Sequence, residues 1–323
     1  MKVKFGIIGL GGIAARFAAV LNTVEGVELV SVASSDKTRA ETFANKFGAS
    51  RAYNSYEDLV KDKEVDVVYI ALTHNFHFEA IKLCLNNNKG VLCEKPMTIN
   101  KKDAKELIAL SKEKNVLLME AMWSRFTPAF IKAKEWVNGG KIGDVKLVDA
   151  SFCFNFPYDP EHRLFNPKLA GGSLFDAGVY PIEFITGILG ENPNLVNGFS
   201  KIGKSGVDEF AIMNMSFETG ALATLSCGLS ANTNGDGYIY GTKGHVVVYN
   251  FIGSKKSELY DNNNKLIESF EEDFQDGFIY EIMHFADLYR NNKIESDIIP
   301  FKDNVACAGI FDDLMNQWGL NVK

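Results

Sequence analysis

The stretch that decides the first part of the fold is GIIGLGGIA, Gly6–Ala14, close to the N-terminus. Its pattern Gly9-x-Gly11-x-x-Ala14 lies between an apolar run typical of a buried strand and the run GIAARFAAVLNTV, which is typical of a helix. In this context the first glycine permits a tight turn, the second lets a pyrophosphate approach the backbone, and a small third residue keeps the helix close to the sheet. The helix N-terminus adds N–H groups and positive potential. The stretch therefore predicts a nucleotide site, with Gly9, Gly11, Gly12 and Ile13 among its contacts.

The chain continues to alternate between apolar strands and amphipathic helices up to residue 121. The strand-like runs are VELVSVAS (27–34), SRAYN (50–54), VDVVYIAL (65–72), GVLCEK (90–95) and VLLMEAM (116–122). Continuous apolar strands alternating with helices indicate a parallel sheet that is covered on both faces. We therefore predict an α/β protein whose residues 1–121 form a doubly wound, dinucleotide-binding Rossmann domain.

After residue 121 the pattern changes to strands joined by short turns rich in glycine and asparagine. These runs are DVKLVDASFCFNF (144–156), EFAIMNMSFETGALATLSCGLS (209–230), GYIYGTKGHVVVYNF (237–251) and SELYDNNNKLIESF (257–270). Helices are predicted from about 172 to 189 and near 277–290 and 303–317. Such meanders form largely antiparallel sheets. Residues 122–323 are predicted to be an α+β domain with an open, largely antiparallel sheet, for substrate binding and oligomerisation.

Composition narrows the class of protein. With 34 basic and 41 acidic residues the net charge is −7, which argues against a nucleic-acid partner. Five cysteines without a CxxC pair indicate reduced thiols in a cytosol. The N-terminal apolar stretch has the outline of a secretory signal, but four glycines interrupt it. No apolar run approaches the roughly 18 residues of a membrane span. We expect a soluble cytoplasmic protein with no membrane partner, and the histidine spacing predicts no metal site.

The end of the second strand bears on which nucleotide is bound. NAD-binding sheets usually place an acidic residue about 20 residues after the glycine loop, to hold the ribose hydroxyls. Here the position is Ser34, followed by Ser35, and Lys37 and Arg39 come soon after. An acidic residue there would repel a 2′-phosphate, whereas a serine can donate a hydrogen bond to it. Asp36 complicates the local charge, and the two basic residues are equally consistent with a solvated helix face. The prediction is NADP, with NAD as the second choice.

At CEKPM, Cys93–Met97, the sequence becomes distinctive. A glycine loop of this kind, ALTHNFH after the fourth strand and Glu94-Lys95-Pro96 after the fifth together resemble the Gfo/Idh/MocA oxidoreductases. The second half agrees, because GGSLFDAGVYPIEFITGILG resembles the D-x-G-x-[HY] helix of that family. MEAMWSRF, HRLFNPKLAGG and Tyr180 resemble most the branch of dimeric dihydrodiol dehydrogenases and NADP-dependent xylose dehydrogenases.

The resemblance implies roles for individual residues. The residues implied to converge on the nicotinamide as catalytic groups are Lys95, Asp176 and Tyr180. Those implied to lie under or near the cofactor are Leu72, Thr73, Asn75, His77, Glu94 and Arg163. Trp123, Arg125, Phe154 and Phe156 are candidate walls of the substrate pocket, although each is equally consistent with ordinary core or rim. The resemblance also favours a cis bond between Lys95 and Pro96, and a homodimer or higher even oligomer formed through the open sheet.

Spacing supports one part of this site independently. Asp176 and Tyr180 are four residues apart on a predicted helix and so share a face. Taken alone, they fit a buried tyrosine bonded to a local carboxylate better than a catalytic pair. With the glycine loop and a strand-tip lysine, they indicate an NAD(P)-dependent oxidoreductase that acts on a hydroxyl or carbonyl carbon of a sugar, polyol or cyclic diol. The alternatives are a catalytically inactive NADP-binding sensor or scaffold, and a methyltransferase, which Ser34 disfavours.

Overall fold

The computed structural model describes residues 2–320, which form two units. The first unit comprises residues up to 98 together with 102–121 and 278–304. The second comprises 99–101, 122–277 and the residues from 305 onward. The chain changes unit after residue 121 and returns to the first unit at residues 278–304. The sequence analysis divides the chain once, between residues 121 and 122.

The first unit contains a parallel sheet with the strand order β3-β2-β1-β4-β5-β6. Its strands are β1 (Val3–Ile8), β2 (Val27–Ala33), β3 (Arg51–Tyr53), β4 (Val67–Ile70), β5 (Gly90–Glu94) and β6 (Leu118–Ala121). The strand order reverses between β1 and β4, and in such sheets ligands bind at the carboxyl ends of the strands at this reversal. The glycine loop after β1 and the segments after β4 and β5 all leave the sheet at this edge.

Helices cover the first sheet. They are α1 (Gly12–Leu21), α2 (Lys37–Phe47), α3 (Tyr56–Lys61), α4 (His77–Asn86), α5 (Lys101–Lys114) and α8 (Phe278–Arg290), with the 3-10 helix η1 (His74–Phe76) before α4. Aromatic packing explains why α8 joins this unit. The ring of Phe285 lies 5.9 Å from that of Phe5, and the ring of Phe278 lies 6.2 Å from that of Phe17.

The second unit contains a sheet with the order β14-β13-β12-β11-β7-β10-β9-β8. The strands are β7 (Val145–Cys153), β8 (Leu195–Ile202), β9 (Asp208–Ser216), β10 (Leu222–Gly228), β11 (Gly237–Gly241), β12 (Gly244–Tyr249), β13 (Lys256–Asp261) and β14 (Leu266–Glu271). All neighbouring strands are antiparallel except β7 and β10, which are parallel. The predicted fold class is confirmed. The sequence analysis missed one strand, the edge strand β8.

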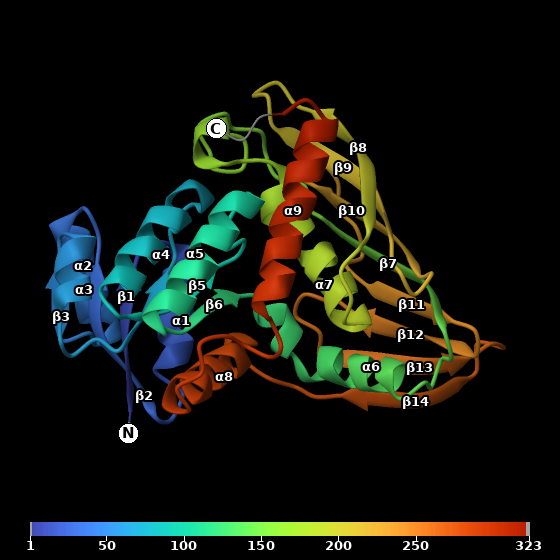
Figure 1. Ribbon diagram of the computed structural model, residues 1–323, viewed down its shortest axis with the longest axis horizontal. Coiled ribbons are helices and arrows are strands. Elements are labelled where there is room, and N and C mark those ends of the chain that lie inside the picture. The colour runs from blue at the N-terminus through green and yellow to red at the C-terminus, as the bar shows by residue number, and fades with distance from the viewer. Residues whose placement is uncertain (1, 321–323) are drawn as a thin grey trace. The chain divides into compact units, whose positions relative to one another are not determined.

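The second unit also contains helices. They include η2 (Trp123–Phe126), α6 (Pro128–Asn138), η3 (Pro167–Leu169), the π-helix η4 (Leu174–Gly178), α7 (Val179–Leu189) and α9 (Phe301–Gln317), whose first turn belongs to the first unit. Helix α6 packs on β12 and β13, and α7 packs on β7 and β10, in front of the strands in Figure 1. On β9 the buried residues Met213 and Met215 alternate with Ile212, which is 52% exposed on the other face.

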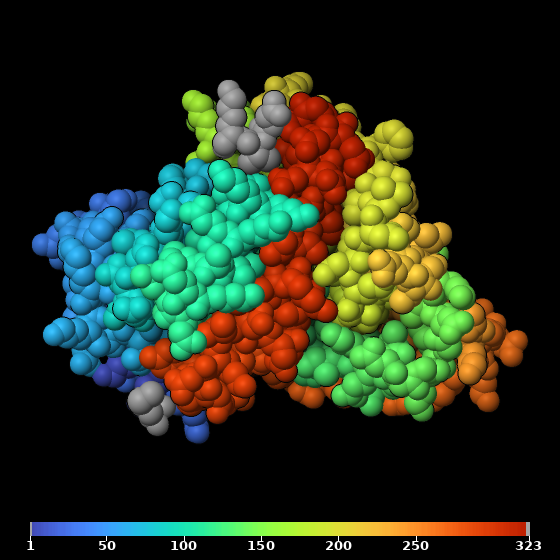
Figure 2. Space-filling model, in the orientation of Figure 1, coloured from blue at the N-terminus to red at the C-terminus, as the bar shows by residue number. Residues whose placement is uncertain are grey.

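The end of α9 covers the edge of β8, as the red and yellow surfaces in Figure 2 show. The side-chain amide of Gln317 accepts a hydrogen bond from the N–H of Gly198 at 3.2 Å and donates one to the carbonyl of Val196 at 3.0 Å. The indole N–H of Trp318 donates to the carbonyl of Gly198 at 2.9 Å. These side chains bond backbone groups that an edge strand would otherwise leave without a neighbouring strand.

Two further findings concern the chain as a whole. All five cysteines are buried and free of disulfides. Within residues 2–320, no helix combines the length and the apolar character that crossing a bilayer would require.

Candidate active site

The glycine loop after β1 has the geometry of a phosphate-binding turn. Gly9 has a φ of +85°, and a Cβ at this position would lie 2.6 Å from the carbonyl oxygen of Ala71, so the turn requires glycine. At Gly11 and Gly12 a Cβ would meet nothing within 4 Å. The backbone of these two residues therefore borders open space, and Ile13 beside them is 37% exposed.

The helix that follows the loop begins without a side-chain cap. Helices α2 and α3 are capped by Asp36 and Ser55, which accept hydrogen bonds from backbone N–H groups, whereas α1 begins after Gly11, which has no side chain. The N-terminus of α1 thus presents backbone donors and positive potential to the space beside Gly11 and Gly12. This arrangement fits the pyrophosphate of a dinucleotide.

A groove of about 380 Å³ continues from the glycine loop along α2. Its lining comprises Leu10, Gly11, Ala15, Asp36, Thr38, Arg39, Thr42, Phe43, Lys46 and Phe47. The two cations among them, Arg39 and Lys46, are two helical turns apart and therefore near one face of α2. Sequence analysis missed Lys46, although its seven-residue spacing from Arg39 was a usable signal.

The other residues expected at the ribose differ in their placement. Ser34 is only 3% exposed, and its hydroxyl accepts a hydrogen bond from the N–H of Asp36 at 3.2 Å. Lys37 has a side chain 71% exposed and pairs with Glu41 at 3.8 Å, and it does not line the groove. Ser35 is exposed. Arg39 and Lys46 are therefore the groove cations that could meet a 2′-phosphate.

His77 connects the ends of two strands. Its ring is fully buried, with Nδ1 2.9 Å from the carbonyl oxygen of Pro96 and Nε2 3.1 Å from that of Leu72. Burial lowers the pKa of His77. Beside it, the hydroxyl of Thr73 donates to the side-chain oxygen of Asn75 at 2.8 Å. The geometry makes His77 a support for the segments after β4 and β5.

The segment that carries Lys95 is anchored by hydrogen bonds to the preceding residue, Glu94. Glu94 is 7% exposed and accepts hydrogen bonds from the hydroxyl of Tyr69 and, at 3.3 Å, from the N–H of Lys95. Burial raises the pKa of Glu94. Tyr69 is itself stacked on Phe17, with 3.6 Å between the ring centroids. Glu94 thus lies beneath the strand tip as part of its anchorage.

On the other side of Lys95, the bond to Pro96 is cis, as the family resemblance favours. The next residue, Met97, donates its N–H to Glu120 at 2.7 Å, and Glu120 accepts a second hydrogen bond from Asn304 at 2.7 Å. The backbone is therefore fixed both before and after Lys95, whose side chain is half-buried.

In the second unit, Asp176 lies within the π-helix Leu174–Gly178 and is 8% exposed. Nη1 of Arg163 lies 2.7 Å from its Oδ1. The predicted helix therefore begins with a π-turn, and the four-residue spacing of Asp176 and Tyr180 spans the junction between π- and α-helix. Such turns are frequent at functional sites.

Tyr180, in the first turn of α7, lies among aromatic side chains. The indole Nε1 of Trp123 donates to its hydroxyl at 3.4 Å, and the ring of Phe152 lies edge-on to its own with 5.5 Å between centroids. Phe154 follows at 5.5 Å from Phe152. Glycine at position 277 leaves room for the indole, because a Cβ there would lie 2.6 Å from it. The sequence analysis did not include Phe152.

The four candidate pocket residues differ in their contacts. Arg125 is 1% exposed, and its guanidinium bonds Glu183 and Thr186 on α7. Phe156 stacks on His162 at 4.4 Å, in a cluster with Leu164 and Phe165. Trp123 thus contacts Tyr180 directly, whereas Phe154 packs against Phe152 and against the same cluster as Phe156.

Each unit carries its own set of chemical groups. The first unit offers a pyrophosphate loop, a groove with two cations and a rigidly mounted lysine. The second offers a tyrosine hydroxyl among aromatic rings and a carboxylate paired with arginine. Within residues 2–320, no cluster of three or more histidine, cysteine, aspartate or glutamate side chains is arranged to hold a metal ion.

Comparisons with known proteins identify both halves of the chain. Residues 3–122 match the family model described as an oxidoreductase family with an NAD-binding Rossmann fold, and residues 130–247 match the GFO/IDH/MocA C-terminal domain. The chain is 34% identical to the mouse (Mus musculus) trans-1,2-dihydrobenzene-1,2-diol dehydrogenase, over 99% of this chain and 98% of that protein. It is 30% identical to the human (Homo sapiens) protein of the same name, with the same coverage.

Solved structures share the fold over the whole chain. An aldose–aldose oxidoreductase from Caulobacter crescentus has a TM-score of 0.89 at 23% identity, covering 98% of this chain and 97% of that one. A variant of a 3-ketoreductase from Actinomadura kijaniata, solved with NADP and TDP-benzene, has a TM-score of 0.87 at 23% identity and covers 98% of both chains.

Proposed function

The chain belongs to the Gfo/Idh/MocA family of NAD-binding oxidoreductases, and we propose that it is an NADP-dependent dehydrogenase of cyclic vicinal diols. The observation that carries the proposal is the environment of Tyr180. Its hydroxyl accepts a hydrogen bond from Trp123 and its ring contacts Phe152, and the same chain has the glycine loop and Lys95. Relatives named for a cyclic diol, matched over nearly their full length, support the substrate class.

The residues of the first unit fit a dinucleotide. Gly9, Gly11 and Gly12 would receive the pyrophosphate at the N-terminus of α1, and Arg39 and Lys46 would meet the 2′-phosphate in the groove along α2. When bound, NADP⁺ supplies the acceptor for the hydride that leaves the carbinol carbon. The two cations favour NADP over NAD, because only NADP carries the additional phosphate.

The proton chemistry belongs to Tyr180 and Lys95. Oxidation of a carbinol requires that a base take the hydroxyl proton, and Tyr180 is proposed to do so. The indole N–H of Trp123 donates to the Tyr180 oxygen and so favours its anionic form. The ammonium group of Lys95 is proposed to add positive charge near the reacting oxygen, and Asp176, held by Arg163, to orient the substrate hydroxyl.

The aromatic surroundings of Tyr180 favour a ring-shaped substrate. Trp123, Phe152 and Phe154 present flat apolar surfaces on which the C–H face of a six-membered ring can pack. A sugar in its ring form shares this face and is the second candidate, which the fold of the aldose–aldose oxidoreductase makes worth testing.

The test is turnover with a substrate panel. Purified protein is mixed with NADP⁺ and, separately, with trans-cyclic diols, their cis isomers, linear polyols and aldoses, and nicotinamide absorbance is followed. We expect the highest kcat/KM with a trans-cyclic diol. A preference for linear polyols, or absence of turnover with every cyclic substrate, would overturn the proposal.

We also propose that the protein works as a cytoplasmic homodimer that pairs through the open sheet face. Free cysteines suit a reducing compartment. On the face opposite the helices, Phe199 is 86% exposed, Leu195 61%, Leu222 55% and Ile212 52%. An apolar patch of this kind is a characteristic feature of an association surface.

A further inference from the structure

The helix that carries Asp176 and Tyr180 begins on a carboxylate from a neighbouring strand. Asp208, the first residue of β9, accepts a hydrogen bond from the Ser173 hydroxyl at 2.7 Å and another from the N–H of Leu174 at 2.7 Å. Both donors reach the same oxygen, Oδ2. Ser173 forms no side-chain cap of its own on the helix backbone. Asp208 therefore performs from outside the helix the function that an N-cap residue usually performs from within.

The surrounding chain is shaped to admit this carboxylate. Gly172 has a φ of +124°, and a Cβ at this position would lie 2.2 Å from Oδ1 of Asp208. Asp208 is 1% exposed, so its charge is removed from water. The thiol of Cys227 on β10 interacts electrostatically with Asp208, and its sulfur lies 3.4 Å from the Ser173 hydroxyl. An ionised carboxylate that is buried without a cation is costly to the folded state, and such groups cluster at functional sites.

We propose that Asp208 is a positioning residue that fixes the first turn of the catalytic helix, and thereby the placement of Asp176 and Tyr180. This inference rests on the proposed function, because it assigns Asp208 to the same reaction. Asp208 acts through Ser173 and Leu174, which lie three and two residues before Asp176 in the chain. A shift of about 1 Å in a reacting group can cost about 10²-fold in rate.

Two substitutions test this role. Asp208→Ala removes the carboxylate that accepts both hydrogen bonds, and Asp208→Asn keeps an amide oxygen that can accept them. For Asp208→Ala we expect kcat to fall about 10²-fold while NADP affinity stays within about twofold, and Asp208→Asn to recover most of the loss. Hydrogen exchange supplies a readout that is independent of turnover. The amides of residues 173–180 should exchange faster in Asp208→Ala and at nearly the wild-type rate in Asp208→Asn.

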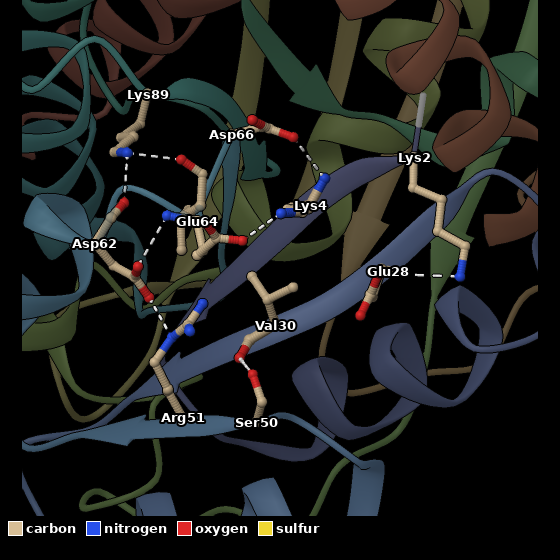
Figure 3. A network of polar contacts seen from close by, with 11 residues as sticks. Lys2, Lys4, Glu28, Val30, Ser50, Arg51, Asp62, Glu64, Asp66 and Lys89 are labelled. Atoms are coloured by element: carbon tan, nitrogen blue, oxygen red, sulfur yellow. Dashed lines mark hydrogen bonds and ion pairs between the residues drawn. The ribbon is translucent and has the colours of Figure 1, made fainter.

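The control is a second hydrogen-bonded carboxylate, the half-buried Asp62, which is far along the chain from this helix. Asp62 accepts hydrogen bonds from Arg51 at 2.7 Å and from the N–H of Glu64 at 2.9 Å, as Figure 3 shows. It accepts a third from the hydroxyl of Tyr53 at 3.1 Å. It precedes β4 and so lies at the amino edge of the first sheet, away from the ligand-binding carboxyl edge. Asp62→Ala should lower stability but leave kcat and the exchange of residues 173–180 unchanged.

The outcomes are distinguishable. If Asp208→Ala matches Asp62→Ala in both kcat and exchange at residues 173–180, the positioning role is overturned. If the wild-type protein oxidises no diol or sugar, the proposed function fails, and the exchange comparison still decides whether Asp208 holds the start of the helix.

Discussion

Nε of Arg125 lies 3.0 Å from Oε2 of Glu183, and both side chains are only 1% exposed. Arg125 is two residues beyond Trp123, and Glu183 is about one turn beyond Tyr180, so the ion pair joins the two segments whose side chains share a hydrogen bond. Gly187 completes the arrangement, because a Cβ there would lie 2.7 Å from the Arg125 Nε. The buried pair thus links η2 to α7, the helix that carries the candidate catalytic tyrosine.

Removing one member of this pair should destabilise the protein strongly. Arg125→Met leaves the Glu183 carboxylate buried without its cation, and the free energy of unfolding should fall by about 3–5 kcal/mol. The double variant Arg125→Met/Glu183→Leu removes both charges and should cost less than either single change. Urea denaturation measures all three. Single and double variants of equal stability would show that the pair contributes little beyond its packing.

Lys95 and Tyr180 should behave as a unit in turnover. Lys95→Ala is expected to reduce kcat by about 10²- to 10⁴-fold, the usual range for acid–base groups, while NADP affinity stays within about tenfold. Tyr180→Phe should do the same, and the double variant should be little worse, since coupled catalytic groups are not additive. Steady-state kinetics on a confirmed substrate provides the measurement. Near-normal turnover by Lys95→Ala would refute the role assigned to it.

Cofactor preference should depend on the cations that line the α2 groove. Arg39→Ala and Lys46→Ala each remove a donor to the 2′-phosphate, so NADP affinity should fall about 10- to 100-fold per change while NAD affinity changes little. Lys37→Ala is the matched control, because Lys37 pairs with Glu41 and lies outside the groove. Calorimetric titration with both cofactors distinguishes the cases. Equal losses for NADP and NAD would argue against phosphate recognition at these residues.

Asp208 should make stability depend on pH. Burial raises the pKa of Asp208 from 3.8 to about 6. Because the folded-state pKa exceeds the unfolded one, the stability contributed by proton binding is fully present below about pH 3.8 and is lost as the pH rises through about 6. The full change corresponds to about 3 kcal/mol.

Asp208→Asn provides the comparison, since an amide does not titrate in this range. The unfolding free energy of the wild-type protein minus that of the variant should fall as the pH rises from about 4 to about 8, as measured by urea denaturation at each pH. A difference that stays constant with pH would mean that the carboxyl is not titrating in the folded state near 6.

The sequence predicts well where its pattern is local. Apart from the short β3, the strands of the first unit are continuous apolar runs, so their existence and their parallel arrangement follow from the hydrophobic pattern. The loop around Gly9 is equally local, because the turn itself requires glycine. Lys95 is predictable for the same reason, since it follows directly after a buried strand.

Long-range packing explains what the sequence did not reveal. Strand β8 shows several exposed apolar side chains and is recognised as a strand only through its pairing with β9. Helix α8 joins the first unit through aromatic contacts with β1 and α1, which are more than 250 residues earlier in the chain. Arg125 looks like a pocket residue by its nearness to Trp123, but its partner Glu183 is visible only in three dimensions.

The last prediction concerns the open face of the second sheet. Phe199 on β8 is directly opposite Ile212 on β9, and both side chains are largely exposed on the face that the helices do not cover. We expect a dimer at micromolar concentration, because burying this apolar patch contributes about 25 cal/mol per Å². The double variant Phe199→Asp/Ile212→Asp should be monomeric, since association would bury four carboxylates per dimer without partners. Met283→Asp, at an equally exposed apolar position on α8 of the first unit, should keep the wild-type mass. Sedimentation equilibrium of the three proteins gives their masses. A monomeric wild-type protein would exclude the dimer, and a dimer that survives the double substitution would place the association surface elsewhere.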